Sequence, residues 1–178
     1  MVIGTEELLK LVRENKLVEN LSERELTNPE GAGLEVRVGE IYALSDSTAF
    51  LGVIERQTPE IKLIAKYGVQ KDYVLEPNEY VLIKTIEKVN LPKEIQGLTM
   101  PRSTLQRCGI ILISTQMDPG YSGELTFGMK NLGGNKFRLE LGARVAKLLF
   151  VKVDGSANLY RGQWKGGRVS TDGREKQV

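Results

Sequence analysis

Histidine is absent from this sequence of 178 residues, and cysteine occurs only once, as Cys108. Without histidine, the chain cannot form a Ser-His-Asp or Cys-His catalytic arrangement or an imidazole metal site. With one cysteine, it cannot form an internal disulfide or a zinc centre built from several thiolates. Acid–base chemistry near neutral pH must therefore come from Asp, Glu, Lys or Tyr side chains. Activation of water on Cys/His-bound zinc is excluded.

Long apolar runs and a large net charge are also missing. No stretch approaches the roughly 18–20 apolar residues of a membrane span, and the N-terminal segment MVIGTEELLKLVREN lacks the apolar core of a secretory signal. The formal net charge is only +2, whereas general nucleic-acid binding usually needs a broad basic face. We therefore expect a soluble, cytoplasmic protein with neither a membrane nor a nucleic-acid partner. Its length and its 40% of hydrophobic residues suit a single core.

The chain is predicted to be mainly β. Residues 5–16 have the apolar spacing of a helix, which Thr5 could cap. From Leu34 onward, short segments rich in β-forming residues are separated by turns that contain Gly or Pro. The predicted strands cover residues 34–38, 41–44, 62–66, 79–89, 110–117, 124–130 and 144–153. Strands at this spacing, with so little helix, indicate a β sandwich or barrel.

The apolar periodicity stops after Val153, and the remaining residues are polar and rich in glycine. Such a segment cannot form its own core, so we expect a β domain over residues 1–159 and a flexible C-terminal arm over residues 160–178. Within the arm, YRGQWKGGRV (160–169) alternates aromatic with basic residues. This composition suits a flap that stacks on a ring and neutralises an anion. A disordered basic tail is the alternative.

Two internal segments carry residues suited to chemistry. MPRSTLQRCGI (100–110) combines two arginines with two hydroxyls, a set that can bind phosphate oxygens, although a solvated turn would have the same composition. In MDPGYSGEL (117–125), Asp118 ends an apolar stretch and enters a Pro-Gly turn. A carboxylate held there could accept a proton from water or bind a sugar hydroxyl. The alternative is an ordinary Asx-type turn between two strands.

Taken in order, these segments resemble the dCTP deaminase/dUTPase superfamily. Residues 75–110 are similar to its central block, which ends in an Arg-Ser-[Ser/Thr]-Leu-x-Arg-x-Gly signature, and MDPGYSGEL resembles its Asp-Pro-Gly-[Trp/Tyr]-x-Gly motif. GARVAKLLF (142–150) resembles a later strand, and the tail resembles the closing arm. GLEVRVG (33–39) is similar to an early element, with Glu35 where Asp is usual. The likeness spans about residues 33–169.

The resemblance implies a distorted jelly-roll-like β-barrel that assembles as a homotrimer with active sites between subunits. It also implies a deoxynucleoside triphosphate substrate and Mg²⁺ held mainly by the triphosphate and water. Deaminases of the superfamily use a glutamate a few residues after the Asp-Pro-Gly motif, and in this sequence that position is Gly128. Because glycine cannot transfer a proton, the favoured activity is dUTP diphosphatase, which converts dUTP to dUMP and pyrophosphate.

The resemblance also implies roles for individual residues. Asp118 would be catalytic and orient water, and Tyr121 would pack under the deoxyribose, while backbone groups of residues 111–116 would read the uracil edge. The substrate-binding residues would be Arg102, Ser103, Thr104, Arg107, Tyr121, Thr126, Lys147, Tyr160, Gln163 and Trp164. Three alternatives stay open: a dCTP deaminase or a bifunctional dCTP deaminase/dUTPase, a non-catalytic nucleotide-binding homologue, and a β domain of unrelated purpose.

Overall fold

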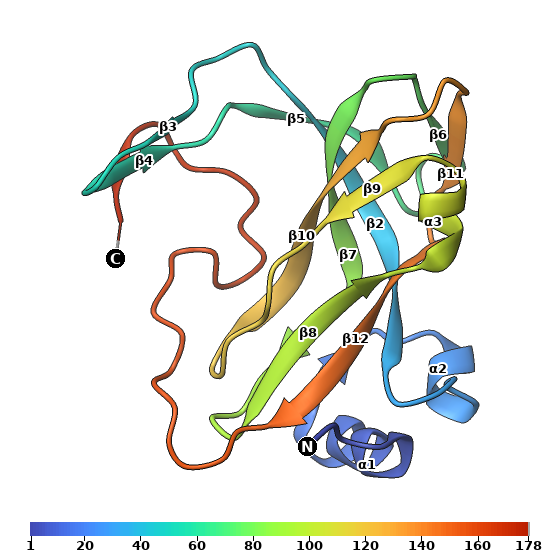
Figure 1. The fold of residues 1–178 in the computed structure, drawn as a ribbon, viewed down its shortest axis with the longest axis vertical. Helices are drawn as coiled ribbons and strands as arrows, with labels where there is room; N and C mark the ends of the chain where they lie inside the picture. The colour runs from blue at the N-terminus through green and yellow to red at the C-terminus, as the bar shows by residue number, and fades with distance from the viewer. Residues whose placement is uncertain (178) are drawn as a thin grey trace.

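The computed structural model describes residues 1–177, and its main feature is an eight-stranded, nearly closed antiparallel sheet (Figure 1). Six strands form the path β8-β12-β2-β7-β10-β9, while β5 pairs with β2 and β1 with β7. Their bounds are β1 Val18–Glu19, β2 Leu34–Leu44, β5 Ile61–Lys66, β7 Tyr80–Asn90, β8 Ile95–Pro101, β9 Ile110–Ile113, β10 Ser122–Asn131 and β12 Arg144–Lys152. The predicted mainly β, barrel-like fold is therefore confirmed.

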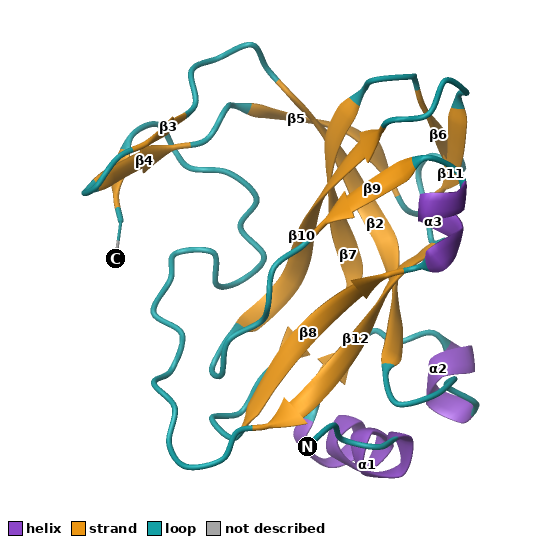
Figure 2. Cartoon of the chain, in the orientation of Figure 1, coloured by secondary structure: helices purple, strands orange, loops and turns teal. Residues whose placement is uncertain are grey.

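Two small sheets and three helices surround the barrel (Figure 2). One small sheet pairs β6 (Asp72–Leu75) with β11 (Phe137–Glu140). The other has the order β13-β4-β3 and contains β3 (Phe50–Leu51), β4 (Glu55–Gln57) and β13 (Glu175–Lys176). The helices are α1 (Thr5–Asn15), α2 (Glu23–Thr27) and α3 (Ser103–Arg107). No helix within residues 1–177 has the length and apolar composition needed to cross a membrane.

The barrel interior holds the core, and strand alternation explains how. Along β7 every second residue is buried, as the two-residue period of a strand requires when one face packs inward. Val36, Ile83, Leu148 and Phe150 are fully buried there. Each such side chain stabilises the fold by about 1.5–3 kcal/mol relative to an exposed position.

The structure corrects two local predictions. Thr5 does not cap the first helix: the N-cap is Gly4, and the Thr5 hydroxyl donates to the Gly31 carbonyl. The strand predicted over residues 110–117 ends at Ile113, and the following residues lead into the Pro-Gly turn with one isolated bridge at Met117. Apolar content alone placed the strand end too late. The short helices α2 and α3 were not predicted, because five residues are too few to show helical periodicity.

Glu40 links three strands of the barrel. From β2, its carboxylate accepts from Lys66 on β5 at 3.0 Å, from Lys84 on β7 at 2.6 Å, and from the Tyr42 hydroxyl. Burial alone would raise the pKa of Glu40. The hydrogen bonds from Lys84, Tyr42 and Lys66 outweigh it and lower that pKa from 4.5 to about 2.

This lowered pKa makes the stability of the fold depend on pH. Because the folded-state pKa lies below the ordinary value of 4.5, the contribution of Glu40 is fully present above about pH 4.5 and is lost as the pH falls through about 2. We expect Glu40→Gln to lower the melting temperature near neutral pH, and its difference from wild type to shrink as the pH approaches 2. Thermal melts followed by circular dichroism measure this difference, and a constant difference would contradict the assignment.

Candidate active site

A cavity of about 470 Å³ lies between the barrel and the C-terminal segment. The residues around it come from β7, β8 and β10, from the turn before β10, and from residues 160–169. Five residues predicted for the site line this cavity: Asp118, Tyr121, Thr126, Tyr160 and Trp164. Segments more than 40 residues apart in the sequence therefore meet in one place, which is where a ligand of nucleoside size could be enclosed.

Asp118 reaches the cavity because the chain turns sharply after it. The Tyr121 amide donates to the Asp118 carbonyl at 3.1 Å, and Gly120 supplies the positive φ of 82° within the turn. The Asp118 carboxylate is half-buried and accepts from Gln116 Nε2 at 3.0 Å. Among the cavity-lining residues in the described part of the chain, it is the only carboxylate. It is therefore the group placed to accept a proton from a water molecule in the cavity.

Tyr121 is a fixed wall of the cavity. Its side chain is buried, its hydroxyl donates to the Glu124 carbonyl at 2.7 Å, and its ring meets that of Tyr160 edge-on at 5.3 Å. Burial, with smaller contributions from Tyr160 and Glu124, raises the pKa of Tyr121 to about 12. The phenol thus stays protonated at all physiological pH values, which suits a packing surface and excludes it as a general base.

Two threonine hydroxyls face the same cavity. Within residues 1–177, the hydroxyl oxygens of Thr99 and Thr126 are buried and have no hydrogen-bond partner, and both residues line the cavity. Buried hydroxyls are normally paired, so these two are suited to meet polar groups of a ligand. Thr126 was predicted for the site. Thr99 was missed because nothing in the sequence of β8 sets it apart from an ordinary strand residue.

The C-terminal segment covers the cavity within the same chain. The Tyr160 amide donates to the Pro119 carbonyl at 2.7 Å, which fixes the start of the segment beside the Asp118 turn. Two guanidinium groups lie near the Trp164 ring, that of Arg56 at 4.3 Å and that of Arg168 at 5.7 Å from its centre. Tyr160 and Trp164 line the cavity, as predicted.

The last residues are joined to the β3–β4 hairpin. Gln163 accepts from Arg56 Nη2 at 2.8 Å and is not among the cavity-lining residues. Glu175 accepts from Arg56 at 2.9 Å and from Arg168 at 2.6 Å, and β13 pairs with β4. Nothing in the sequence indicated this contribution from the hairpin. The mobility expected of the arm stays a prediction.

A glycine contact joins the C-terminal segment to strand β10. Gly123 has φ 149°, and a Cβ atom there would lie 2.8 Å from the Gly166 carbonyl carbon and would overlap the Gly167 amide nitrogen. Only glycine permits this approach. The Gly166 amide donates to the Ser122 carbonyl at 2.7 Å beside it. The residues between Tyr121 and Glu124 thus hold the cover as well as the wall of the cavity.

The residues predicted to bind phosphate lie elsewhere on the chain. None of Arg102, Ser103, Thr104, Arg107 and Lys147 lines the cavity. Helix α3, which carries Ser103–Arg107, projects from the opposite side of the barrel from the C-terminal segment (Figure 1). Ser103, Thr104 and Arg107 are exposed, whereas Lys147 Nζ donates to the Glu30 carbonyl at 2.7 Å. One chain therefore presents two separate groups of predicted site residues.

The Tyr80 ring occupies the space in which a side chain at position 128 would begin. A Cβ atom on Gly128 would overlap the Tyr80 hydroxyl oxygen and lie 3.0 Å from two carbons of the Tyr80 ring. Tyr80 stands on β7, next to the Gly128–Leu82 pair of the β10–β7 ladder. The nearest carboxylate along β10, that of Glu124, packs against Gly167 and is not among the cavity-lining residues.

Comparison with known proteins places this fold and site in one family. Residues 2–153 match the family described as dCTP deaminase-like. The chain belongs to the dCTP deaminase-like family. It is 30% identical over 174 residues to a dCTP deaminase of Pyrobaculum islandicum, a match that covers 96% of this chain and 95% of the relative.

Relatives within the family carry different activities in their names. A probable deoxyuridine 5′-triphosphate nucleotidohydrolase of Aeropyrum pernix is 36% identical over 137 residues, covering 76% of this chain and 83% of the relative. Among solved structures, the 2′-deoxycytidine 5′-triphosphate deaminase of Agrobacterium tumefaciens has the same fold, with a TM-score of 0.65 at 14% identity. That match covers 84% of this chain and 47% of the longer Agrobacterium chain.

Proposed function

We propose that this protein is a dUTP diphosphatase that hydrolyses dUTP to dUMP and pyrophosphate. The observation that carries the proposal is the packing of Tyr80 over Gly128. On the family resemblance, residue 128 is where a deaminase places the glutamate that moves protons at the pyrimidine ring. Here Tyr80 fills that space, and Asp118 is left as the carboxylate of the cavity. The relative named as a probable dUTP nucleotidohydrolase supports this choice.

In the proposed mechanism, Asp118 orients a water molecule and accepts its proton as the water oxygen attacks the α-phosphorus in line. The bond from the α-phosphorus to the bridging oxygen breaks, and that oxygen leaves with pyrophosphate. The Gln116 amide donates to the Asp118 carboxylate at 3.0 Å and holds this general base in place. Tyr121 packs under the deoxyribose, where a 2′-hydroxyl would clash. Trp164 and Tyr160 cover the uracil ring and exclude water from the cavity.

Mg²⁺ fits this site as a companion of the substrate. Within residues 1–177 no three Asp, Glu, Cys or His residues form a group that could hold a metal. Mg²⁺ is commonly bound through substrate phosphates and waters with one or two carboxylates, and the single carboxylate that Asp118 brings to the cavity suits that mode. When bound to the triphosphate, the metal would offset its negative charge.

The separation of the two groups of site residues supports an assembly of several copies. Arg102, Ser103, Thr104 and Arg107 are suited to the triphosphate, yet none of them lines the cavity, and α3 lies on the other side of the barrel from the C-terminal segment (Figure 1). We propose that a second copy in a homotrimer supplies them, so that each active site lies between subunits. The exposed positions of Ser103, Thr104 and Arg107 agree with this role.

The test is a parallel assay of dUTP and dCTP with Mg²⁺, in which pyrophosphate and ammonia are measured together. We expect pyrophosphate from dUTP and no ammonia from dCTP. Ammonia release from dCTP would instead establish a deaminase or a bifunctional enzyme, as several relatives are named. Tight dUTP binding without pyrophosphate release would indicate a non-catalytic homologue.

A further inference from the structure

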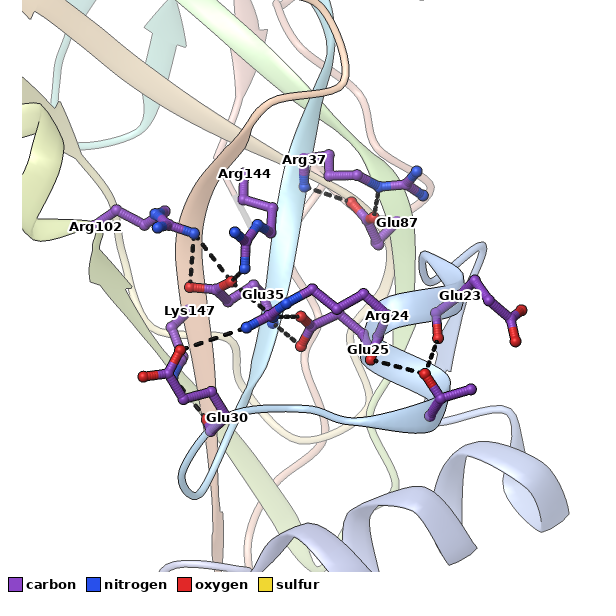
Figure 3. A network of polar contacts seen from close by, with 11 residues as sticks. Glu23, Arg24, Glu25, Glu30, Glu35, Arg37, Glu87, Arg102, Arg144 and Lys147 are labelled. Carbon is purple, nitrogen blue, oxygen red and sulfur yellow. Dashed lines mark hydrogen bonds and ion pairs between the residues drawn. The ribbon is translucent and has the colours of Figure 1, made fainter.

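Glu35 on strand β2 lies at the centre of a network of arginines (Figure 3). Its side chain is only 6% exposed, and its carboxylate contacts three guanidinium groups. Arg102 donates from Nη1 to both carboxylate oxygens, at 2.9 and 3.0 Å, and Arg24 Nη1 lies 3.2 Å from Oε2. Arg144 also donates to Oε2. Within residues 1–177, Arg24 also pairs with Glu25 and Glu30, whereas Arg102 and Arg144 form ion pairs with Glu35 alone.

The contact with Arg102 uses only part of that side chain. In the described residues, the side-chain hydrogen bonds of Arg102 all come from Nη1, and the side chain is 28% exposed. A guanidinium has five N–H donors in one plane. The two bonds from Nη1 to the Glu35 oxygens restrain the guanidinium and leave the donors on Nε and Nη2 for a ligand.

Glu35 is itself held firmly. Its backbone amide donates to Glu25 Oε2 at 2.9 Å, and the Glu25 side chain is fully buried. Glu25 also pairs with Arg24, and both belong to α2. Strand pairing adds to this, because Lys147 on β12 stands opposite Glu35 on β2. Helix α2 contributes no residue to the cavity, but through Glu25 it holds Glu35, which in turn contacts Arg102.

We propose that Glu35 is a positioning residue for Arg102, which it holds in the orientation that meets the β- and γ-phosphates of the substrate. The inference rests on the proposed function, because it assigns Arg102 to the triphosphate. Glu35 itself does not touch the substrate: its oxygens are occupied by the three arginines. Without the Glu35 charge, Arg24 would keep Glu25 and Glu30, but Arg102 and Arg144 would lose their carboxylate partner. Arg102 would then have to be ordered anew by each ligand.

The test compares Glu35→Gln with Glu87→Gln. Glu87 on β7 is a matched control, because its fully buried carboxylate also pairs with an arginine of β2: it lies 2.6 Å from Arg37 Nε. Within residues 1–177 it has no hydrogen bond or ion pair with Arg102. Calorimetry would measure binding of a non-hydrolysable dUTP analogue, of dUMP and of inorganic tripolyphosphate, each with Mg²⁺. We expect Glu35→Gln to weaken binding of the analogue and of tripolyphosphate by about tenfold or more, since a hydrogen bond to a charged group contributes about that much to affinity.

The contrast among ligands separates positioning from general destabilisation. Binding of dUMP, which lacks the β- and γ-phosphates, should stay within threefold, and Glu87→Gln should leave all three ligands within threefold. In turnover, KM for dUTP should rise while kcat changes little. An equal loss of dUMP binding, or the same loss in Glu87→Gln, would overturn the proposal. Against an Arg102→Ala background, Glu35→Gln should add less than twofold, and a full additional loss would also overturn it.

Glu35→Asp keeps the test decisive if Glu35→Gln does not fold. A carboxylate shortened by one methylene cannot hold all three arginines equally. Binding of the analogue and of tripolyphosphate should therefore weaken, while binding of dUMP should not. No change, or an equal change for dUMP, would overturn the proposal. A wild-type chain that binds tripolyphosphate but not dUTP would refute the proposed function and leave the Glu35 test to proceed on tripolyphosphate. A chain that binds neither refutes both.

Discussion

Replacing Asp118 with asparagine is expected to abolish dUTP hydrolysis, with a loss of at least roughly 100-fold, while nucleotide binding stays within a few-fold of wild type. The amide has nearly the same shape as the carboxylate and can still contact Gln116, which lies 3.0 Å from Asp118. It cannot accept a proton from water. Pyrophosphate release and calorimetric binding of a non-hydrolysable dUTP analogue measure the two effects separately.

Asp154→Asn is the matched control for this experiment. Asp154 is an exposed carboxylate just after β12, so the same chemical change there should leave activity near that of wild type. An Asp118→Asn protein that retains substantial turnover would mean that another group activates the water. Equal loss of binding and turnover would mean that Asp118 acts by holding the substrate.

Removal of residues 160–178 should reduce turnover of dUTP by roughly 100-fold, because loss of the cover leaves the reacting groups poorly positioned and open to water. The truncated chain loses Tyr160, Trp164 and Arg168 from the cavity wall. It keeps the buried barrel core, apart from the partly buried Tyr160 packed against it. We therefore expect a fall in melting temperature of only a few degrees. Steady-state kinetics and thermal melts of the two proteins measure both effects.

Glu175→Gln tests the same cover without deleting it. This variant weakens the pairs with Arg56 and Arg168 that join the C-terminal segment to the β3–β4 hairpin. Because the variant weakens these ion pairs and leaves the C-terminal segment in the chain, we expect a smaller loss of turnover than on truncation and an unchanged fold. A collapse of the melting temperature on truncation would show instead that the segment is structural, and unchanged turnover would remove it from the site.

The fold was predictable because its strands carry the two-residue period of one buried face. In β7 and β10 this alternation is nearly regular, and the predicted bounds differ from the observed ones by one or two residues. The prediction was wrong where local sequence does not decide the outcome. The apolar residues on either side of residues 114–116 suggested one continuous strand, yet this polar segment leaves β9, and Thr115 and Gln116 line the cavity.

The candidate site was predictable in its motifs but not in its spatial arrangement. Asp118 and Tyr121 follow from a Pro-Gly turn, and the sequence also indicates Arg102 and Arg107 as phosphate ligands. That these pairs lie on opposite sides of one barrel depends on strand order, which no local pattern encodes. Contacts of the hairpin residue Arg56 with the C-terminal segment join positions 107 and 119 residues apart, and they too lie beyond sequence reasoning.

The Tyr80–Gly128 contact has a consequence for how the two chemistries of this family could interconvert over evolutionary time. A glutamate introduced at position 128 alone would collide with the phenol, and overpacking of this kind typically costs about 1–3 kcal/mol. A smaller residue at position 80 alone would leave space above Gly128 and would supply no carboxylate at position 128. A glutamate at position 128 therefore requires the Tyr80 side chain, which lies at the surface, either to move aside or to be replaced.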